Sequence, residues 1–393
     1  MCSSGRSFVY IRVAPTAGNV KPPGPRQPAA GLRGISGLCR PPIVTTVSAS
    51  PHSAVRAEAP SSRAVGLWLL ACCAMIFAMV VIGGVTRLTE SGLSIVEWKP
   101  VSGALPPLTQ ADWEAEFAKY RQIDQYKQMN AGMSLAEFKR IFFWEWFHRL
   151  WGRLIGLVFL VPFVWFWWRG AVRGRLAGQL LALFCLGGLQ GAIGWWMVAS
   201  GLKRDMLAVS QYRLAVHLAL ALALHAGLLW LALDLLRGRR AASTGRKAAA
   251  ALAGLVFLTI VAGAFVAGLD AGLVSDTFPL MDGRLVPAGY ADIEPFWRNL
   301  FENHAAVQFN HRWLGIFTAA CALVFAWRFA RAADAGDRIA VLAVPAASVV
   351  QAALGIATLM LWVPVPLAAA HQAGAVILLT AAVVAAHALG RRG

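Results

Sequence analysis

The sequence predicts an all-α polytopic membrane protein whose eight transmembrane helices form two pseudo-symmetric four-helix bundles. Three observations predict this fold class: the composition, the number of long apolar segments, and an internal repeat. Of the 393 residues, 58% are hydrophobic and 14% are charged, whereas about a quarter of a soluble domain is charged. Eight apolar segments are long enough to cross ~30 Å of hydrocarbon as helices; they lie near 64–86, 144–168, 176–199, 209–236, 247–269, 304–330, 336–362 and 366–390.

The basic residues explain the net charge of +17 as a topology signal. Arginines and lysines gather before the first span, in the loops after the second and fourth spans, and at the C-terminus, whereas the loop at 87–143 is balanced and that at 269–303 is acidic. Because cytoplasmic loops carry the excess of Lys and Arg, both termini are expected to be cytoplasmic. The charge therefore indicates membrane topology and not a nucleic-acid partner. We expect a multi-pass protein of the cell inner membrane, or alternatively of the mitochondrial inner membrane.

Four regions follow from this pattern. Residues 1–63 form a basic extension with eight Lys or Arg against the single Glu58, and its Pro, Ser, Gly and Arg content predicts disorder. It is either a cytoplasmic tail (or a misassigned start) or an organelle transit peptide. Residues 64–236 are expected to form an N-terminal bundle, 237–247 a cytoplasmic linker, and 248–393 a C-terminal bundle.

An internal repeat relates the two bundles. HRLWGRLIGL at 148–157 resembles HRWLGIFTAA at 311–320, LQGAIGWWM at 189–197 resembles VQAALGIATL at 350–359, and RLAVHLALA at 213–221 resembles PLAAAHQAG at 366–374. Each half therefore carries one histidine on its second helix and one on its fourth. An even number of spans per unit keeps both halves in the same orientation, related by an axis along the membrane normal.

Four histidines are the strongest functional signal. His148, His217, His311 and His371 each lie a few residues inside an outward-facing helix end, so we expect them at one depth, ~6–13 Å below the outer surface. Two histidines on facing helices can bind a heme iron from both sides. A helix–helix hydrogen bond is the alternative for any one histidine, but four at repeated positions favour binding of a metal or cofactor.

Charged residues beside these histidines differ between the halves. Glu145 lies three residues before His148, where the second half has Gln308. Glu145 is a candidate catalytic group facing a cofactor, or alternatively an ion-pair partner of Arg149 one turn away. Arg149 and Arg312 each follow a histidine and are candidate partners for heme propionates, with snorkelling toward lipid headgroups as the alternative.

Three segments carry a resemblance to a known family: GGVTRLTESGLSIVEWKPVSGALPP at 83–107, EFKRIFFWEWFHRLWGR at 137–153, and QFNHRWLG at 308–315. Together they resemble the heme A synthase family over about 64–390. Other branches of that family carry a cysteine pair in the first outward loop, and residues 87–143 have none. The chain therefore resembles the proteobacterial and mitochondrial branch, and a thiol relay through that loop is excluded.

The resemblance implies an oxidoreductase that converts heme O to heme A for cytochrome oxidase, by two hydroxylations of the C8 methyl group that end in a formyl group. It implies a resident heme b bound by His311 and His371. The substrate heme O would bind in the N-terminal half at His148 and His217, with Glu145 as a further catalytic residue. The implied partners are membrane lipid, a heme O synthase (protoheme farnesyltransferase) and an electron donor.

Two other functions fit the four histidines. A di-heme b-type protein that transfers electrons from quinol would use the same ligands in two equivalent halves. A carrier would bind heme without altering it. The sequence leaves open the electron donor, the source of oxygen and whether the chain forms a homo-oligomer.

Overall fold

The computed structural model describes residues 62–100, 102–331 and 333–392, so the predicted disorder of the N-terminal extension lies almost wholly outside the described residues. Eight of the described helices have the length and composition of a membrane span, which confirms the all-α, multi-pass fold class. They are α1 Ser62–Leu88, α4 Leu135–Trp168, α5 Gly174–Gly201, α6 Gln211–Arg237, α7 Thr244–Gly268, α9 His304–Phe329, α10 Ala335–Met360 and α11 Val365–Ala388.

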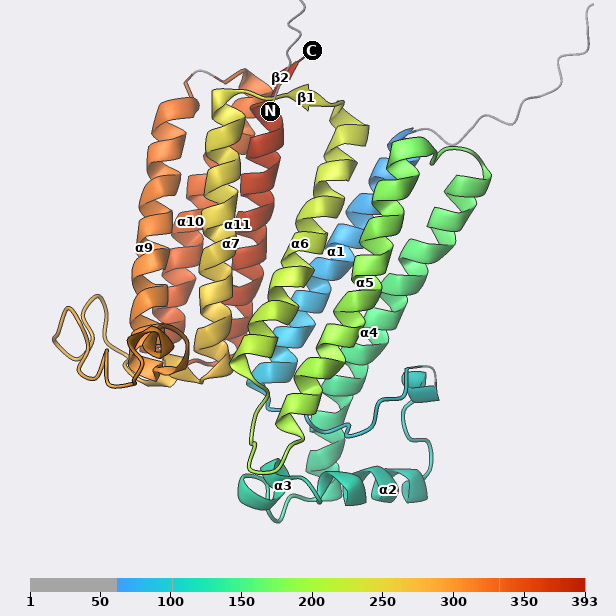
Figure 1. The fold of residues 1–393 in the computed structure, drawn as a ribbon, viewed down its shortest axis with the longest axis vertical. Helices are drawn as coiled ribbons and strands as arrows, with labels where there is room; N and C mark the ends of the chain where they lie inside the picture. Colours follow the sequence, from blue (N-terminus) through green and yellow to red (C-terminus); the bar gives the residue numbers. More distant parts are fainter. Residues whose placement is uncertain (1–61, 101, 332, 393) are drawn as a thin grey trace, which may run out of the picture. The chain divides into compact units, whose positions relative to one another are not determined.

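The same neighbour pattern occurs in each set of four helices (Figure 1). In the first set, α4 and α6 pack against α1, and α5 packs against α4 and α6. In the second set, α9 and α11 pack against α7, and α10 packs against α9 and α11. The sets meet where α6 contacts α7 and where α11 contacts α1 and α6. The symmetry axis that would relate two bundles, and the boundaries of the two domains, stay predictions.

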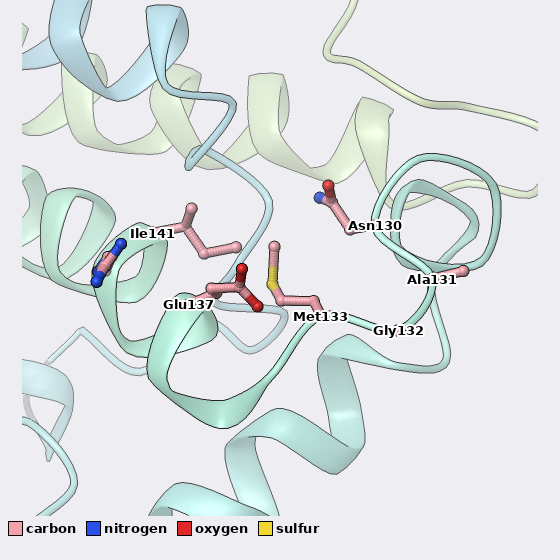
Figure 2. A pocket seen from close by; sticks show the side chains of 7 residues that line it. Asn130, Ala131, Gly132, Met133, Glu137 and Ile141 are labelled. Atoms are coloured by element: carbon pink, nitrogen blue, oxygen red, sulfur yellow. The ribbon is translucent and has the colours of Figure 1, made fainter.

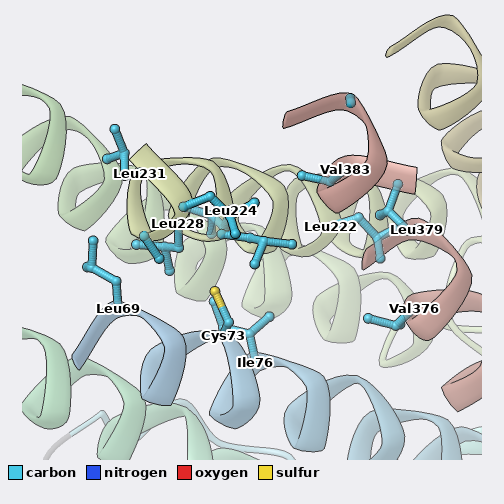
Figure 3. Packing of buried hydrophobic residues seen from close by; sticks show 14 of the residues in the cluster. Leu69, Cys73, Ile76, Leu222, Leu224, Leu228, Leu231, Val376, Leu379 and Val383 are labelled. Atoms are coloured by element: carbon cyan, nitrogen blue, oxygen red, sulfur yellow. The ribbon is translucent and has the colours of Figure 1, made fainter. Parts of the chain in front are cut away.

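Buried hydrophobic residues of α1, α6 and α11 pack together where the two sets meet (Figure 3). This seam is built from Leu69, Cys73 and Ile76 on α1, Leu222, Leu224, Leu228 and Leu231 on α6, and Val376, Leu379 and Val383 on α11. Lipid tails are as apolar as leucine, so this packing stabilises the fold through close van der Waals contact rather than through exclusion of water. The helices differ in burial accordingly. In the most apolar stretch of α1, 44% of the residues are buried, whereas in that of α5 only 6% are, so α5 faces the lipid.

The second membrane span begins earlier than the sequence analysis expected. The apolar run predicted a start near 144, but α4 begins at Leu135. Ser134 and Glu137 form a capping box in which each side chain accepts from the other residue's backbone N–H, an arrangement that satisfies the free amides of a helix start. His148 consequently lies thirteen residues into its helix, and the first turns of α4 stand outside the apolar stretch.

These first turns of α4 belong to a small aromatic cluster with the loop between α1 and α4, which is called the first outer loop because the charge pattern predicts that it faces away from the cytoplasm. The loop contains η1 Ser102–Ala104, α2 Gln110–Tyr120 and α3 Asp124–Gln128. Phe117 and Tyr120 of α2 pack on Phe138 and Phe142 of α4, and all four side chains are buried. The cluster fixes the first outer loop against the first turns of α4, ahead of His148 on the same helix.

The remaining elements are short. The second outer loop contains η2 Ala271–Leu273, η3 Phe296–Arg298 and α8 Asn299–Glu302. On the opposite side, β1 Arg240–Ala241 in the linker pairs antiparallel with β2 Arg391–Arg392, with Arg240 opposite Arg392 and Ala241 opposite Arg391. This pair joins the linker between the two helix sets to the C-terminal end of the chain.

Candidate functional site

Each of the four histidines lies against a glycine on a neighbouring helix. A β-carbon added at the glycine would come closer to the histidine Cε1 than real β-carbons approach other atoms: 2.9 Å for Gly83 and His148, 2.9 Å for Gly194 and His217, 2.9 Å for Gly263 and His311, and 2.7 Å for Gly355 and His371. The four glycines come from α1, α5, α7 and α10. The repeat is therefore one of contacts as well as of sequence, and any larger residue would displace the ring.

The sequence analysis did not single out Gly263. The other three glycines lie in segments already quoted for the repeat or the family resemblance, whereas Gly263 lies in a plain apolar run. Its signal is positional: α7 corresponds to α1 in the repeat, and Gly263 faces His311 as Gly83 faces His148.

The two histidines of the C-terminal half face each other. The ring centres of His311 and His371 are 6.4 Å apart and their planes lie at 84°. Two imidazoles that bind one metal ion through bonds of about 2 Å, with ring nitrogens roughly 1 Å from the ring centres, have centres about 6 Å apart. The spacing of these rings therefore fits a single iron between them.

Unused ring nitrogens also fit iron ligation. Among the described residues, the Nδ1 atoms of His148, His217 and His311 are buried and have no hydrogen-bond partner, and the same holds for those of His225 and His387 elsewhere in the fold. A buried polar atom without a partner costs about 1–3 kcal/mol, so these nitrogens are free to bind a ligand but do not by themselves mark one. These nitrogens fit the donor set of a heme protein in both halves.

Glu145 is buried, with 3% of its surface exposed, and fully hydrogen-bonded. Its Oε2 accepts from the Ser94 hydroxyl at 2.8 Å and from the Ile95 backbone N–H at 2.7 Å. Its Oε1 accepts from Nη2 of Arg149 at 2.6 Å. The ion pair considered in the sequence analysis is therefore present, and Glu145 also anchors the first outer loop.

Gln308 occupies the equivalent place and makes bonds of the opposite kind. Its amide nitrogen donates to the carbonyl of Ser275 at 2.9 Å and to that of Gly272 at 3.3 Å, both in the second outer loop. The acid of the first half thus binds loop donors, and the amide of the second half binds loop acceptors.

The two arginines that follow histidines hold the outer loops. Arg149 donates to the carbonyls of Ile95 and Glu97 at 2.8 and 3.0 Å. Nη1 of Arg312 donates to three carbonyls of the second loop, at Thr277, Pro279 and Leu280. Arg312 still has two buried donors, Nε and Nη2, without a partner among the described residues. Its guanidinium therefore keeps the capacity to bind an anionic group.

Other candidate features do not join this site. His225 contacts the Thr380 hydroxyl at 2.9 Å and His387 contacts Asp234 at 3.1 Å. Both contacts join α6 to α11, so these two histidines hold the two sets of helices together. A pocket in the first outer loop is lined by Asn130, Ala131, Gly132, Met133, Glu137, Arg140 and Ile141 and includes none of the four histidines (Figure 2).

The fold and the site together define a class: a multi-pass helical membrane protein with four partly buried histidines at repeated positions, a residue type that binds heme iron. The chain belongs to the COX15-CtaA family, described as cytochrome oxidase assembly protein, whose family profile matches residues 66–383.

Similar proteins include the heme A synthases of three bacteria. That of Rhodospirillum centenum is 54% identical over 85% of this chain and 91% of its own length. That of Maricaulis maris is 52% identical over 83% of this chain and 96% of its own length. That of Parvibaculum lavamentivorans is 50% identical over 86% of this chain and 98% of its own length. The similarity thus covers all eight spans.

Proposed function

We propose that this protein is an oxidoreductase that converts the C8 methyl group of heme O to the formyl group of heme A, for use in cytochrome oxidase. Relatives at 50–54% identity that carry the name heme A synthase support this function. The structural observation that carries it is the repeated histidine–glycine contact, with two histidines of the C-terminal half at the spacing of a bis-imidazole iron site. The substrate reaches the protein from a heme O synthase, and a separate electron donor or acceptor serves the reaction.

In this proposal the two halves bind different hemes. The domain of residues 248–393 holds a resident heme b between His311 and His371, and the domain of residues 64–236 binds heme O at His148 and His217, with the linker 237–247 between them. When bound, heme b would supply one-electron redox chemistry. The ring spacing in the C-terminal half and the buried acid in the N-terminal half support this assignment.

Glu145 is the proposed catalytic acid–base or charge-stabilising residue. A buried carboxylate next to the substrate methyl group would stabilise positive charge developing there, or accept the proton released on oxidation. Its bonds to Ser94, Ile95 and Arg149 hold it in one orientation, which favours a preorganised role. Arg149 and Arg312 are the proposed propionate partners, and the free donors of Arg312 support this more strongly than the filled set of Arg149.

We place the protein in the cell inner membrane with both termini in the cytoplasm, from the distribution of Lys and Arg. Single cysteines on opposite sides test this topology, in a background from which the six native cysteines have been removed. Gln128 and Ala242 are exposed and suit labelling, whereas Gln125 in the same outer loop is 4% exposed and does not. A membrane-impermeant reagent should label Gln128→Cys from outside and Ala242→Cys only after the membrane is opened. Labelling of both from one side would overturn this topology.

Electron transfer between two hemes is the second candidate function, because both halves show the same histidine–glycine contacts. A carrier that rocks one half against the other is disfavoured by polar contacts between the halves at several depths. These include Tyr212 to Glu302 at 2.8 Å, Gln372 to the carbonyl of Val80 at 2.8 Å, and His387 to Asp234 at 3.1 Å.

Extraction and separation of the pigments in the purified protein discriminates these functions. A synthase should carry heme B together with heme O, its hydroxylated form or heme A. Heme B alone would favour electron transfer, and heme O that is bound but never oxidised in cells that make cytochrome oxidase would favour a carrier.

A further inference from the structure

One hydrogen bond between the two halves is made by a residue adjacent to a site histidine. Gln372 directly follows His371 on α11, and its Nε2 donates to the carbonyl oxygen of Val80 on α1 at 2.8 Å. Successive side chains of a helix point about 100° apart, so His371 faces Gly355 within its own half while Gln372 faces the other half. The bond therefore joins the helix that carries a histidine of the second half to the first helix of the first half.

The amide of Gln372 occupies the space left by a glycine. A β-carbon added at Gly84 would lie 2.0 Å from Oε1 of Gln372 and 2.7 Å from its Cδ, closer than real β-carbons approach other atoms. In an α-helix the carbonyl of Val80 accepts from the backbone N–H of Gly84, and a carbonyl oxygen has a second lone pair. Because Gly84 has no side chain, Gln372 is able to reach that lone pair.

Two neighbouring glycines of α1 face the two different sites. Gly83 lies against the ring of His148, with an added β-carbon 2.9 Å from Cε1, whereas Gly84 lies against Gln372. An unbroken series of neighbours, in the chain or in space, therefore joins the two sites and consists of His148, Gly83, Gly84, Gln372 and His371. A shift of α11 against α1 consequently moves one histidine relative to the other.

The seam between α6 and α7 has apolar residues at the equivalent place. Leu218 corresponds to Gln372, since each follows the histidine of a fourth helix, and Ala264 corresponds to Gly84, since each follows a glycine that faces a histidine. Neither of these apolar side chains is able to form a hydrogen bond. A hydrogen bond requires a narrow range of distance and angle, so at the level of the histidines the contact of α11 with α1 defines the position of the halves more closely.

We propose that Gln372 and Gly84 are positioning residues that fix the separation of the two histidine sites. This proposal rests on the proposed binding of a heme in each half. A misplacement of about 1 Å between reacting groups costs on the order of a hundredfold in rate, and heme b in the C-terminal half would supply one-electron chemistry. A fixed separation is therefore a requirement of the proposed reaction, and the bond from Gln372 to Val80 provides it where no water competes for the carbonyl.

Distances between spin labels on the two halves test the proposal without reference to heme. Leu189 and Val350 are exposed, occupy equivalent places in the repeat and lie on α5 and α10, so each suits a labelled cysteine in a background from which the six native cysteines have been removed. Gln372→Ala removes the donor, and Gly84→Ala displaces the amide from the carbonyl. Each should broaden the distribution of distances between the two labels.

The same variants should lower heme A about tenfold while the content of heme b stays normal, because the misplacement affects the reaction and not the heme site itself. Both substitutions remove one bond, so the double variant Gly84→Ala/Gln372→Ala should be no more perturbed than either single variant in distance or in heme A. Effects that add would show that the two residues act independently, which would overturn the proposal.

Two control variants separate this bond from general strain. Gly66→Ala adds a β-carbon 2.7 Å from Cγ of Leu236, a clash on the same helix but within the first half. Tyr212→Phe removes the bond to Glu302 at 2.8 Å, another bond between the halves. Both should leave the distances and heme A unchanged. A broadening in either control as large as that in Gln372→Ala would overturn the proposal.

Gln372→Met takes the place of Gly84→Ala if that variant fails to accumulate, because the thioether has a similar length and does not donate. Unchanged distances in Gln372→Met and Gln372→Ala would overturn the proposal. Broadened distances with normal heme A would overturn it as well, since the separation would then not govern the reaction. Absence of heme A with the unsubstituted protein would instead reject the proposed function, and the distances would still show whether the bond holds the halves.

Discussion

The two halves of the molecule use residues of opposite hydrogen-bonding character at equivalent positions. Three residues before the histidine of the second helix, Glu145 accepts bonds from Ser94 and Ile95, whereas Gln308 donates to the carbonyls of Gly272 and Ser275. The outer loop of the first half thus presents donors at this position, and that of the second half presents acceptors. Each side chain matches its own loop.

This difference shows that an acid beside a histidine has two separable explanations. The loop contacts alone explain why the first half has a carboxylate, since the donors of its loop require an acceptor. The arginine that follows each of these histidines has the same role in both halves, because Arg149 and Arg312 both donate to loop carbonyls. A catalytic role for Glu145 therefore needs a test in which the loop contacts are retained.

The largest expected effect comes from the histidines of the C-terminal half. His311→Ala or His371→Ala should remove the proposed low-spin heme b while the protein still inserts, because each removes one of the two proposed iron ligands. His148→Ala is the matched variant in the other half and should retain that heme. The heme-to-protein ratio and the visible spectrum of each purified variant measure the outcome. Full heme b in either C-terminal variant would contradict the division between the halves.

Glu145→Gln should retain heme b and yet lower the yield of heme A at least tenfold, with heme O or a partly oxidised product accumulating. The amide oxygen is still able to accept from Ser94 and Ile95, but the negative charge and the bond from Arg149 are lost, and the side chain becomes the residue type of the second half. Chromatography of total heme, from a strain in which this variant is the sole copy, gives the answer. Near-normal heme A would reduce Glu145 to a structural partner of Arg149 and of the loop.

The reciprocal change, Gln308→Glu, sharpens the same comparison. It would place a carboxylate against two carbonyl oxygens, and an unsatisfied buried polar contact costs about 1–3 kcal/mol. Less protein should accumulate in the membrane, as measured by immunoblot, whereas Glu145→Gln should accumulate normally. Equal accumulation of both variants would show that loop polarity does not determine the residue type.

The glycines that face histidines should give a smaller, local effect. Gly355→Ala would bring a β-carbon to 2.7 Å from the His371 ring, and Gly194→Ala to 2.9 Å from the His217 ring, so each should lower heme occupancy several-fold in its own half. Gly191→Ala is the control on α5, since nothing lies within 4 Å of its added β-carbon. Heme content and the low-spin spectrum measure the result. An effect of Gly191→Ala as large as that of Gly194→Ala would exclude ring contact as the cause.

The smallest effect concerns acid stability of the two outer loops. Arg298 and Tyr212 hold the pKa of Glu302 below its usual range, and Lys99 and Lys119 do the same for Glu97. A carboxylate with a lowered pKa stabilises the fold above its unfolded pKa of about 4.3, and that stabilisation is lost as the pH falls through the lowered value. Both groups are partly exposed, so the change should be small.

Amide hydrogen exchange of the loops should therefore be constant, after correction for intrinsic rates, from pH 7 to about pH 5 and should accelerate below about pH 4. Glu302→Gln should abolish the acceleration in the second loop alone. Acceleration in the second loop that persists in this variant would assign the acid sensitivity to another group.

The sequence by itself determined the eight spans, the fold class and the four histidines. Hydropathy and span length are local properties, because the thickness of the hydrocarbon layer sets how many apolar residues a helix needs. The histidines were recognised because each half carries one on its second helix and one on its fourth. The start of α4 at Leu135 was missed, although the capping pair Ser134 and Glu137 was present in the sequence.

The tertiary structure decided which polar groups meet. The contact of Gly263 with His311 and the opposite polarities at Glu145 and Gln308 depend on contacts between helices or loops that are distant in the chain. Composition and periodicity report which face of a helix is apolar, but not which donor lies opposite which acceptor. Within a bilayer, each buried polar group must find its partner inside the protein, and only the packed arrangement of the helices determines that partner.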